Sequence, residues 1–249
     1  KPVKLLFVGD IMFDRYVRQA VEKYGKGDYN HIFGQIKDKL SEYDLVVGNL
    51  EGPITDKSSV SVGTAMDEKK NFVFTFDPAV AKVLAENNIN LVNLGNNHIL
   101  NQGEDGLVET RKNLDAAGVQ YFGDTGADDV IASEAKQSRG NSTNDGIAAV
   151  ASLPRNDKIE IIGGIKIGFV NYNYSVAGSL ERAVEDIKNI KTKSDIVVVC
   201  PHWGTEYKVG DPGQKIRSEA YQLIGAGADA IIGTHPHVVQ IAEVYKGKK

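Results

Sequence analysis

The chain has 249 residues, of which 41% are hydrophobic and 25% are charged, a composition typical of globular proteins that bury a full core. Its formal net charge of -4 supplies no basic field, so we expect no nucleic-acid partner. The sequence contains no apolar run of the roughly 18 residues that cross a bilayer, and the single cysteine, Cys200, excludes an internal disulfide. We therefore expect a chain that is soluble as given and forms one domain over residues 1–249.

Five short apolar and β-branched runs each end in a cluster of glycine, asparagine, aspartate or histidine. These runs predict strands at residues 3–8, 45–47, 91–94, 196–199 and 230–232. Helical spacing of apolar residues predicts helices at residues 78–87, 104–117, 179–190 and 213–226. Alternating strands and helices predict an α/β fold with parallel strands, whose carboxyl ends carry the ligand-binding residues.

The middle of the chain departs from this alternation. Two apolar runs, at residues 158–162 and 166–172, flank Gly163-Gly164 and predict a hairpin that belongs to a second sheet. Residues 136–145 include no apolar side chain, which indicates a solvated loop. We interpret residues 136–157 as a loop insertion.

Histidine is the most informative residue type in this sequence. Four of the five histidines fall in the strand-end clusters, at His98, His202, His235 and His237. Neutral imidazole is a common ligand of zinc, iron and related divalent ions, and carboxylates complete such sites. A bound divalent ion polarises a phosphoryl or carbonyl oxygen and activates water, so this residue set predicts metal-dependent hydrolysis.

Each histidine also has a simpler interpretation. His235 and His237 are two residues apart, and Pro236 favours an extended segment that would turn both side chains to the same side; the alternative is a pair of surface histidines. His202 could be a buried side chain beside Trp203. The position of all three at predicted strand ends favours metal ligation.

The remaining candidates are oxygen and amide groups. Asp10 and Glu51 are the candidate carboxylate ligands, although Asp10 could be only a turn residue and either Asn49 or Glu51 could be the ligand of its cluster. His98 could be a hydrogen-bonded loop residue, but Asn97 before it offers an amide oxygen as a ligand or an amide donor for a phosphate oxygen. Together these residues predict one site.

As an ordered set, the strand-end motifs resemble those of the calcineurin-like metallophosphoesterases and, more closely, the CapA family of bacterial capsule and poly-γ-glutamate synthesis proteins. The motifs are Gly9-Asp10-Ile11-Met12, Asn49-Leu50-Glu51-Gly52-Pro53-Ile54-Thr55, Asn96-Asn97-His98, Pro201-His202-Trp203-Gly204-Thr205-Glu206-Tyr207 and His235-Pro236-His237-Val238-Val239-Gln240. The resemblance spans almost the whole chain. It implies a four-layer α/β/β/α sandwich of mixed sheets with a metal site at the strand ends.

The resemblance also implies roles for individual residues. The implied metal ligands are Asp10, Asn49, Glu51, Asn97, His202, His235 and His237, with Asn49 or Glu51 as the bridge between two ions. Asn97 would also contact phosphate, and His98 would be the general acid or a transition-state stabiliser. We expect substrate contacts from Arg15, Glu206 and Tyr207.

The implied cofactor is one or two divalent ions of manganese, zinc, iron or magnesium. The implied function is capsule or poly-γ-glutamate biosynthesis or export, by hydrolysis or transfer on a small phosphate ester or an anionic cell-envelope polymer. Membrane synthase subunits are possible partners, and the full-length protein would be extracytoplasmic and membrane-anchored, with this chain trimmed at its C-terminus.

Two departures from the metallophosphoesterase pattern affect that expectation. Met12 stands where the first motif usually has histidine, and Asn49 stands where a bridging aspartate is usual. A site for one ion is therefore an alternative to a site for two. The rival function is a noncatalytic accessory subunit that binds polyglutamate or a synthase partner through the same pocket.

Overall fold

Two sheets form the centre of the computed structural model, which describes residues 1–123, 125 and 157–248. Within these residues each sheet has four strands. The first sheet has the order β1-β2-β3-β4, and all of its strands are parallel. Its strands are β1 (Leu5–Ile11), β2 (Leu45–Leu50), β3 (Ile89–Asn93) and β4 (Gln120–Phe122).

The second sheet has the order β5-β6-β7-β8. Its strands are β5 (Asp157–Ile162), β6 (Ile165–Asn173), β7 (Ile196–His202) and β8 (Ala230–Ile231). Strand β5 is antiparallel to β6 and the other pairs are parallel, so the predicted hairpin and second sheet are confirmed. The predicted insertion over residues 136–157 lies outside the described residues except for its last residue, which opens β5.

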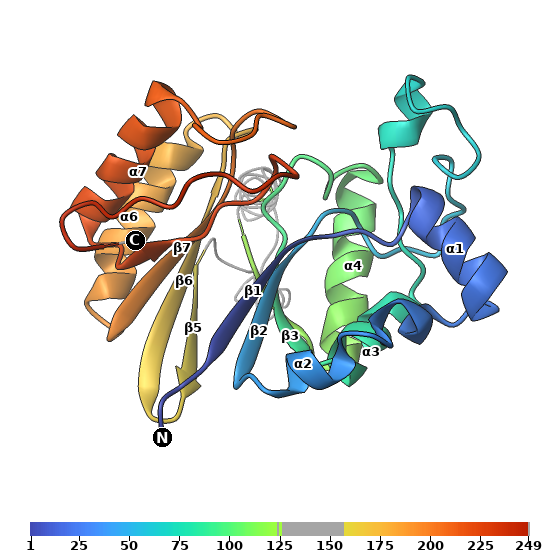
Figure 1. Ribbon diagram of the computed structural model, residues 1–249, viewed down its shortest axis with the longest axis horizontal. Coiled ribbons are helices and arrows are strands. Elements are labelled where there is room, and N and C mark those ends of the chain that lie inside the picture. The colour runs from blue at the N-terminus through green and yellow to red at the C-terminus, as the bar shows by residue number, and fades with distance from the viewer. Residues whose placement is uncertain (124, 126–156, 249) are drawn as a thin grey trace, which may run out of the picture.

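The helices cover the outer face of each sheet (Figure 1). The helices beside the first sheet are α1 (Arg15–Gly25), α2 (Lys37–Ser41), α3 (Ala79–Glu86) and α4 (Gly103–Ala117), together with the short 3-10 helix η1 (Tyr29–Phe33). A second 3-10 helix, η2 (Lys69–Phe72), lies in the segment between β2 and α3. Helices α6 (Ser179–Lys191) and α7 (Gln214–Ala226) pack on the second sheet. None of the helices in the described residues is long and apolar enough to cross a membrane.

A third apolar cluster holds the two sheets together. Leu91 and Phe122 of the first sheet pack against Phe169 and Val198 of the second, and all four side chains are buried. The apolar residues of β2, β3, β6 and β7 therefore face both a helical layer and the opposite sheet, which explains why their sequences read as continuous apolar runs. The expected α/β/β/α sandwich of four layers is confirmed.

The strand bounds differ from the sequence prediction at the site. Strand β1 extends to Ile11 and so includes Asp10, which the sequence placed after the strand. The register of β1 against β2 shifts between Phe7 and Asp10, and Gly9 between them has a φ of 78°, a conformation that glycine adopts without strain. This bulge sets the direction in which the Asp10 side chain leaves the strand.

Candidate metal centre

The candidate site lies where the carboxyl ends of the two sheets meet. The first sheet contributes Asp10 from β1 and Asn49 from β2, and the second contributes His202 at the end of β7. Loops that follow β2, β3 and β8 carry the other predicted ligands, Glu51, Asn97, His235 and His237. The structure therefore brings the predicted strand-end residues together, as the parallel topology requires.

The half of the site from the first sheet is a chain of amide and carboxylate hydrogen bonds. Asn49 Nδ2 donates to Asp10 Oδ1 at 2.8 Å and lies 3.3 Å from His202 Nδ1. Asn96 Nδ2 donates to Asn49 Oδ1 at 3.2 Å and to the Leu50 carbonyl at 2.8 Å. In this arrangement Asn49 presents its amide nitrogen to Asp10, so ligation through its oxygen requires the amide to turn away from Asn96.

His202 is completely buried at the centre of the site. Its Nε2 atom lies 2.7 Å from Asn97 Oδ1, and its Nδ1 atom lies 3.1 Å from Thr234 Oγ1. Burial lowers the pKa of His202 to about 3, so the imidazole is neutral at physiological pH. Neutral imidazole is the form that binds a metal.

The loop after β8 differs from the sequence prediction. His235 and His237 have φ values of 96° and 55°, so the prediction of an extended segment held by Pro236 is wrong. Backbone hydrogen bonds bend this loop: Trp203 N–H donates to the Thr234 carbonyl, and Tyr207 N–H donates to the Pro236 carbonyl. Positive φ at a residue other than glycine costs on the order of 1–3 kcal/mol and is concentrated at functional sites.

The bent loop nevertheless brings both histidines to Asp10. The His235 N–H donates to Asp10 Oδ2 at 3.1 Å, and His237 Nδ1 lies 3.0 Å from the same oxygen. Burial raises the pKa of Asp10, but the hydrogen bond from His237 and the further interactions with His202, Asn49 and the His235 N–H together outweigh burial and hold that pKa below its usual range. Asp10 is therefore ionised and available to a cation.

Two overlapping groups of side chains could hold a metal ion. Glu51, His235 and His237 form one group, and Asp10, Glu51 and His202 form the other; within each group the potential ligand atoms lie within 4.8 Å of one another. Glu51 belongs to both groups, which is the position expected of a bridging ligand. The described residues thus include side-chain groups suited to a divalent ion.

Two buried atoms of these groups have no hydrogen-bond partner among the described residues. They are Glu51 Oε1 and His235 Nδ1; the Glu51 atom lies 3.8 Å from His202 Nε2 and 3.9 Å from His237 Nε2, beyond hydrogen-bond distance. Burial is the main cause that raises the pKa of Glu51 to about 8, and the nearby Asp10 carboxylate raises it further. A buried polar group without a partner is costly, and a bound cation would satisfy both atoms, so the residues present fit a metal.

The predicted catalytic residues lie beside this cluster. Asn97 is exposed apart from its contact with His202, whereas His98 is partly buried. The His98 ring packs on the Phe74 ring with a centroid distance of 4.2 Å, and its Nδ1 atom lies 3.1 Å from Asn101 Oδ1. Burial lowers the pKa of His98. Asn101 and Phe74 therefore fix the orientation of a largely neutral ring.

The predicted substrate contacts lie at the edge of the site. The Tyr207 ring centroid is 5.8 Å from that of His237. Burial lowers the pKa of His235 and the Glu206 carboxylate opposes that change, which places Glu206 close to the same cluster. Arg15 opens α1, shortly after β1. Tyr207 and Glu206 thus neighbour the ligand cluster, and Arg15 contacts the Phe74 ring on which His98 packs.

Several residues of the site are not among those that the sequence predicts. Asn96 positions Asn49, Thr234 contacts His202, and the Tyr174 hydroxyl lies 3.1 Å from His235 Nε2. The Gly-Asn-Asn-His motif contained a signal for Asn96, because asparagine next to a candidate ligand offers both a donor and an acceptor. Tyr174 follows β6, a strand for which the sequence predicts no ligand.

Asparagine side chains join the two sheets beneath the site. Asn171 Nδ2 donates to the Gly95 carbonyl at 3.1 Å and to the Cys200 carbonyl at 3.0 Å, and Asn93 Nδ2 donates to the Cys200 carbonyl at 3.4 Å. A Cβ atom on Gly95 would lie 2.1 Å from Asn171 Oδ1, so the close approach requires glycine. This contact fixes the loop that carries Asn97.

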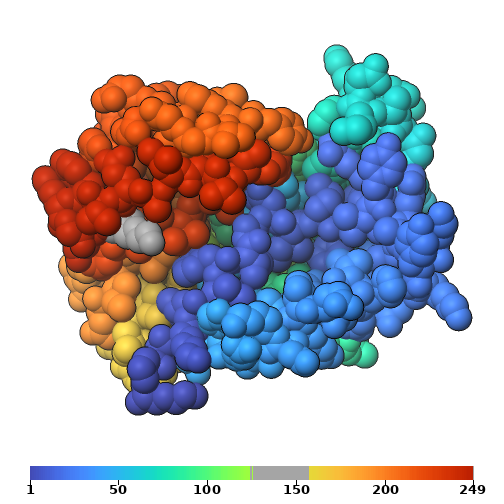
Figure 2. Space-filling view, viewed as in Figure 1, coloured from blue at the N-terminus to red at the C-terminus, as the bar shows by residue number. Residues whose placement is uncertain are grey.

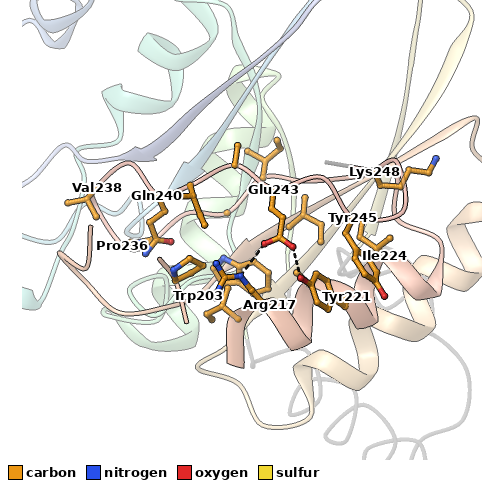
Figure 3. Close-up of a pocket in the computed structure, with 18 residues that line it drawn as sticks. Trp203, Arg217, Tyr221, Ile224, Pro236, Val238, Gln240, Glu243, Tyr245 and Lys248 are labelled. Carbon is orange, nitrogen blue, oxygen red and sulfur yellow. Dashed lines mark hydrogen bonds and ion pairs between the residues drawn. The ribbon is translucent and has the colours of Figure 1, made fainter. Parts of the chain in front are cut away.

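A cavity of about 350 Å³ lies behind the metal-ligand loop, between α7 and the last residues of the chain. Figure 3 shows Glu243 in this cavity accepting hydrogen bonds from Arg217 and Tyr221. Trp203 and Pro236 line its wall. Because these two residues adjoin the site histidines in sequence, the cavity borders the back of the candidate site.

A four-layer sandwich in which histidines and carboxylates converge from the ends of both sheets is the architecture of the calcineurin-like metallophosphoesterase superfamily. Residues 4–249 match the family model described as bacterial capsule synthesis protein PGA_cap. The chain belongs to this bacterial capsule synthesis family, and the resemblance to CapA proteins is confirmed.

Similar proteins include two from Bacillus. The PGA biosynthesis protein CapA of Bacillus subtilis is 32% identical over 246 residues, covering 97% of this chain and 59% of that protein. The capsule biosynthesis protein CapA of Bacillus anthracis is 30% identical over 248 residues, covering 97% of this chain and 56% of that protein. The chain therefore spans somewhat more than half the length of these relatives.

Two further comparisons are more distant. A probable polyglutamine synthesis accessory protein of Mycobacterium tuberculosis is 26% identical over 288 residues, covering 99% of this chain and 71% of that protein. The crystal structure of a hypothetical protein from Thermus thermophilus superposes with a TM-score of 0.51 and 20% identity, covering 98% of this chain and 73% of that chain. That structure supports the fold alone.

Proposed function

We propose that this chain is the metal-dependent catalytic part of a protein that makes or exports a capsule or poly-γ-glutamate polymer. Its reaction is hydrolysis or transfer on a phosphate ester or on a bond of an anionic envelope polymer. The observation that carries the proposal is a pair of buried ligand atoms, Glu51 Oε1 and His235 Nδ1, that have no hydrogen-bond partner within the described residues and lie among the converging carboxylates and histidines. The names of the two Bacillus relatives support the role in the capsule.

In this proposal Asp10, Glu51, His202, His235 and His237 hold one or two ions of manganese, zinc, iron or magnesium. When bound, such an ion supplies Lewis-acid polarisation of a phosphoryl or carbonyl oxygen and lowers the pKa of water. The protein supplies orientation. Thr234 and Asn49 contact His202 Nδ1, so the Nε2 atom on the other side of the ring faces Asn97.

Asn97 and His98 contact the reacting group in this proposal. Asn97 is exposed and so can reach a substrate oxygen with its amide. The contact between His98 Nδ1 and Asn101 fixes the imidazole ring, so that it can stabilise or protonate a leaving oxygen without reorienting.

A noncatalytic accessory role is the second candidate. It is favoured by Asn49, whose amide nitrogen rather than its oxygen faces Asp10, and by Met12 at the position of a usual ligand. In that role the same pocket binds the polymer for membrane synthase subunits, with the full-length protein anchored outside the cytoplasm. The relative in Mycobacterium tuberculosis is named as an accessory protein.

Metal content and turnover together test these roles. Wild type, a His235→Ala, His237→Ala double variant and the control His31→Ala are dialysed against Mn²⁺ or Zn²⁺ and analysed by mass spectrometry; His31 is exposed and outside the site. We expect ions in wild type and in the control but not in the double variant. Metal binding with cleavage of model phosphate esters or γ-glutamyl amides supports the enzyme, polymer binding without cleavage supports the accessory role, and absence of metal from wild type refutes the site.

A further inference from the structure

Arg15 presents a fixed guanidinium group beside the candidate metal centre. Its Cζ atom lies 4.7 Å from the centroid of the Phe72 ring and 4.6 Å from that of the Phe74 ring, so the planar group contacts two aromatic rings. Its Nε–H donates to the Asn71 carbonyl at 2.7 Å. Three contacts therefore define the orientation of this side chain.

The base of Arg15 is equally well fixed. The Asp14 carboxylate is completely buried and accepts hydrogen bonds from the Arg15 N–H, the Thr75 N–H and the Ser59 hydroxyl. Arg15 itself has a φ of 53°, an uncommon conformation for a residue with a long side chain. The start of α1 is thus anchored to the segment that carries both aromatic rings.

The free part of the guanidinium faces the solvent. No carboxylate in the described part of the chain lies within ion-pair distance of Arg15, and the Nη atoms make no hydrogen bond there. The segment with Phe72 projects from the molecular surface next to α1, as the cyan segment in Figure 2 shows. A charged planar donor fork without an anionic partner is a group prepared for a carboxylate or a phosphate.

Phe74 connects this group to the candidate catalytic residues. The same ring that contacts Arg15 packs on His98, with a centroid distance of 4.2 Å and an interplanar angle of 32°. His98 follows Asn97 in the chain, and Asn97 Oδ1 lies 2.7 Å from His202 Nε2. One aromatic ring therefore connects the guanidinium to the residues that border the candidate metal centre.

We propose that the Arg15 guanidinium, held by Phe72, Phe74 and the Asn71 carbonyl, is the subsite that binds an oxyanion of the substrate next to the candidate metal centre. The inference rests on the proposed function, because it assigns a substrate group to the same site. A carboxylate and a phosphate both match the donor fork, so the subsite selects substrates that carry an anionic group adjacent to the reacting bond. Arg15 acts by positioning and selecting this group.

Calorimetric titration tests the subsite with two probes, inorganic phosphate and a short γ-linked glutamate oligomer, on metal-free and Mn²⁺-loaded protein. The variants are Arg15→Gln and Arg15→Lys, and the matched control is Lys23→Gln, which removes one positive charge from an exposed position of the same helix. We expect Arg15→Gln to weaken binding of at least one probe about ten- to hundredfold, as for the loss of a charged hydrogen-bonded pair. The control should bind within about twofold of wild type, as expected for an exposed charge.

The two probes distinguish the sources of the oxyanion. If binding of the glutamate oligomer weakens in Arg15→Gln, the subsite binds a carboxylate. If binding of phosphate weakens, the subsite binds a phosphate. Either result supports the proposal. Equal binding by wild type and a folded Arg15→Gln variant overturns it, as does an equal loss in Lys23→Gln. If Arg15→Gln does not fold, Arg15→Lys decides, because a lysine that binds at the wild-type level refutes recognition by the planar fork.

Metal content and turnover of the same proteins separate this proposal from the proposed function. Arg15→Gln should retain the metal content of wild type, because Arg15 is not among the candidate ligand groups. If the wild type binds a probe through Arg15 but cleaves no substrate, the proposed subsite is supported and the proposed catalytic function is refuted. Cleavage with the same KM in wild type and Arg15→Gln preserves catalysis and refutes the subsite.

Discussion

Replacing Glu51 with glutamine should have opposite effects on the metal-free and metal-loaded protein. Glu51 Oε1 is buried and has no hydrogen-bond partner in the described part of the chain, so the metal-free fold carries the cost of burying this carboxyl group. Glutamine keeps the shape of the side chain and removes its charge. Glu51→Gln should therefore stabilise the metal-free protein while weakening its response to a cation, because Glu51 belongs to both candidate ligand groups.

The size of this effect follows from the environment of the carboxyl group. Burial, followed by the Asp10 carboxylate, raises the pKa of Glu51 to about 8. A carboxyl whose pKa rises on folding loses stability as the pH increases from its unfolded value of about 4.3 towards its folded value, at about 1.36 kcal/mol per pH unit. The loss is about 4 kcal/mol at pH 7, which corresponds to a midpoint of thermal unfolding about 8–16 °C higher in Glu51→Gln.

Thermal unfolding followed by circular dichroism measures this difference after chelation and again with excess Mn²⁺. The advantage of Glu51→Gln in the chelated protein should disappear below pH 4, and Mn²⁺ should raise the midpoint of wild type more than that of the variant. The control is Glu185→Gln at an exposed position of α6, which should leave the midpoint unchanged. A lower midpoint for chelated Glu51→Gln at pH 7, or an equal Mn²⁺ response in both proteins, would refute the reasoning.

Three further outcomes are expected elsewhere in the fold. Gly95→Ala places a Cβ atom 2.1 Å from Asn171 Oδ1 and should lower the free energy of unfolding by about 1–3 kcal/mol or more in urea titrations; wild-type stability would show that the sheets separate without cost. Burial raises the pKa of Asp229, but hydrogen bonds from two lysines and a backbone N–H outweigh burial and lower it to about 2, so Asp229→Asn should cost about 1 kcal/mol at pH 7 after solvent screening. Because this contribution exists above the unfolded pKa, the difference from wild type should vanish as the pH falls from 4 to 2, and a constant difference across that range would contradict the assignment. Burial raises the pKa of the Cys200 thiol to about 12, so thiol reagents should label it only in denaturant, and rapid labelling of the native protein would contradict its burial.

Much of the fold could be predicted because the strands have strong local signals. The β-branched runs that became β2, β3 and β7 are buried on both faces, so they appear in the sequence as uninterrupted apolar segments. Strand β4 has only three residues, Gln120–Phe122, and pairs with β3 through tertiary contacts that no local pattern reveals. Helix α1 was also not predicted, since its buried side is confined to Val21 and a few partly buried residues.

The site was predictable in composition but not in backbone geometry. Histidine and asparagine at strand ends identified the residues that converge, because parallel strands place their carboxyl ends on one edge. The positive φ values of His235 and His237 could not be inferred, since they depend on hydrogen bonds from the separate segment with Trp203 and Tyr207. Likewise, the Asn49 amide is oriented by Asn96 rather than by its own neighbours in sequence.

The two sheets are held together by interactions that do not depend on a metal. Phe122 and Phe169 pack between the sheets, and burying an aromatic or aliphatic side chain of this kind contributes about 1.5–3 kcal/mol. Glu51 and His235 come from opposite sheets, and each has a buried atom without a hydrogen-bond partner among the residues that the structure describes. The packing between the sheets can offset the cost of these two atoms. The sandwich core therefore holds these ligand atoms in position before any ion binds. An ion that contacts both residues would stabilise the packing of the two sheets by its binding free energy.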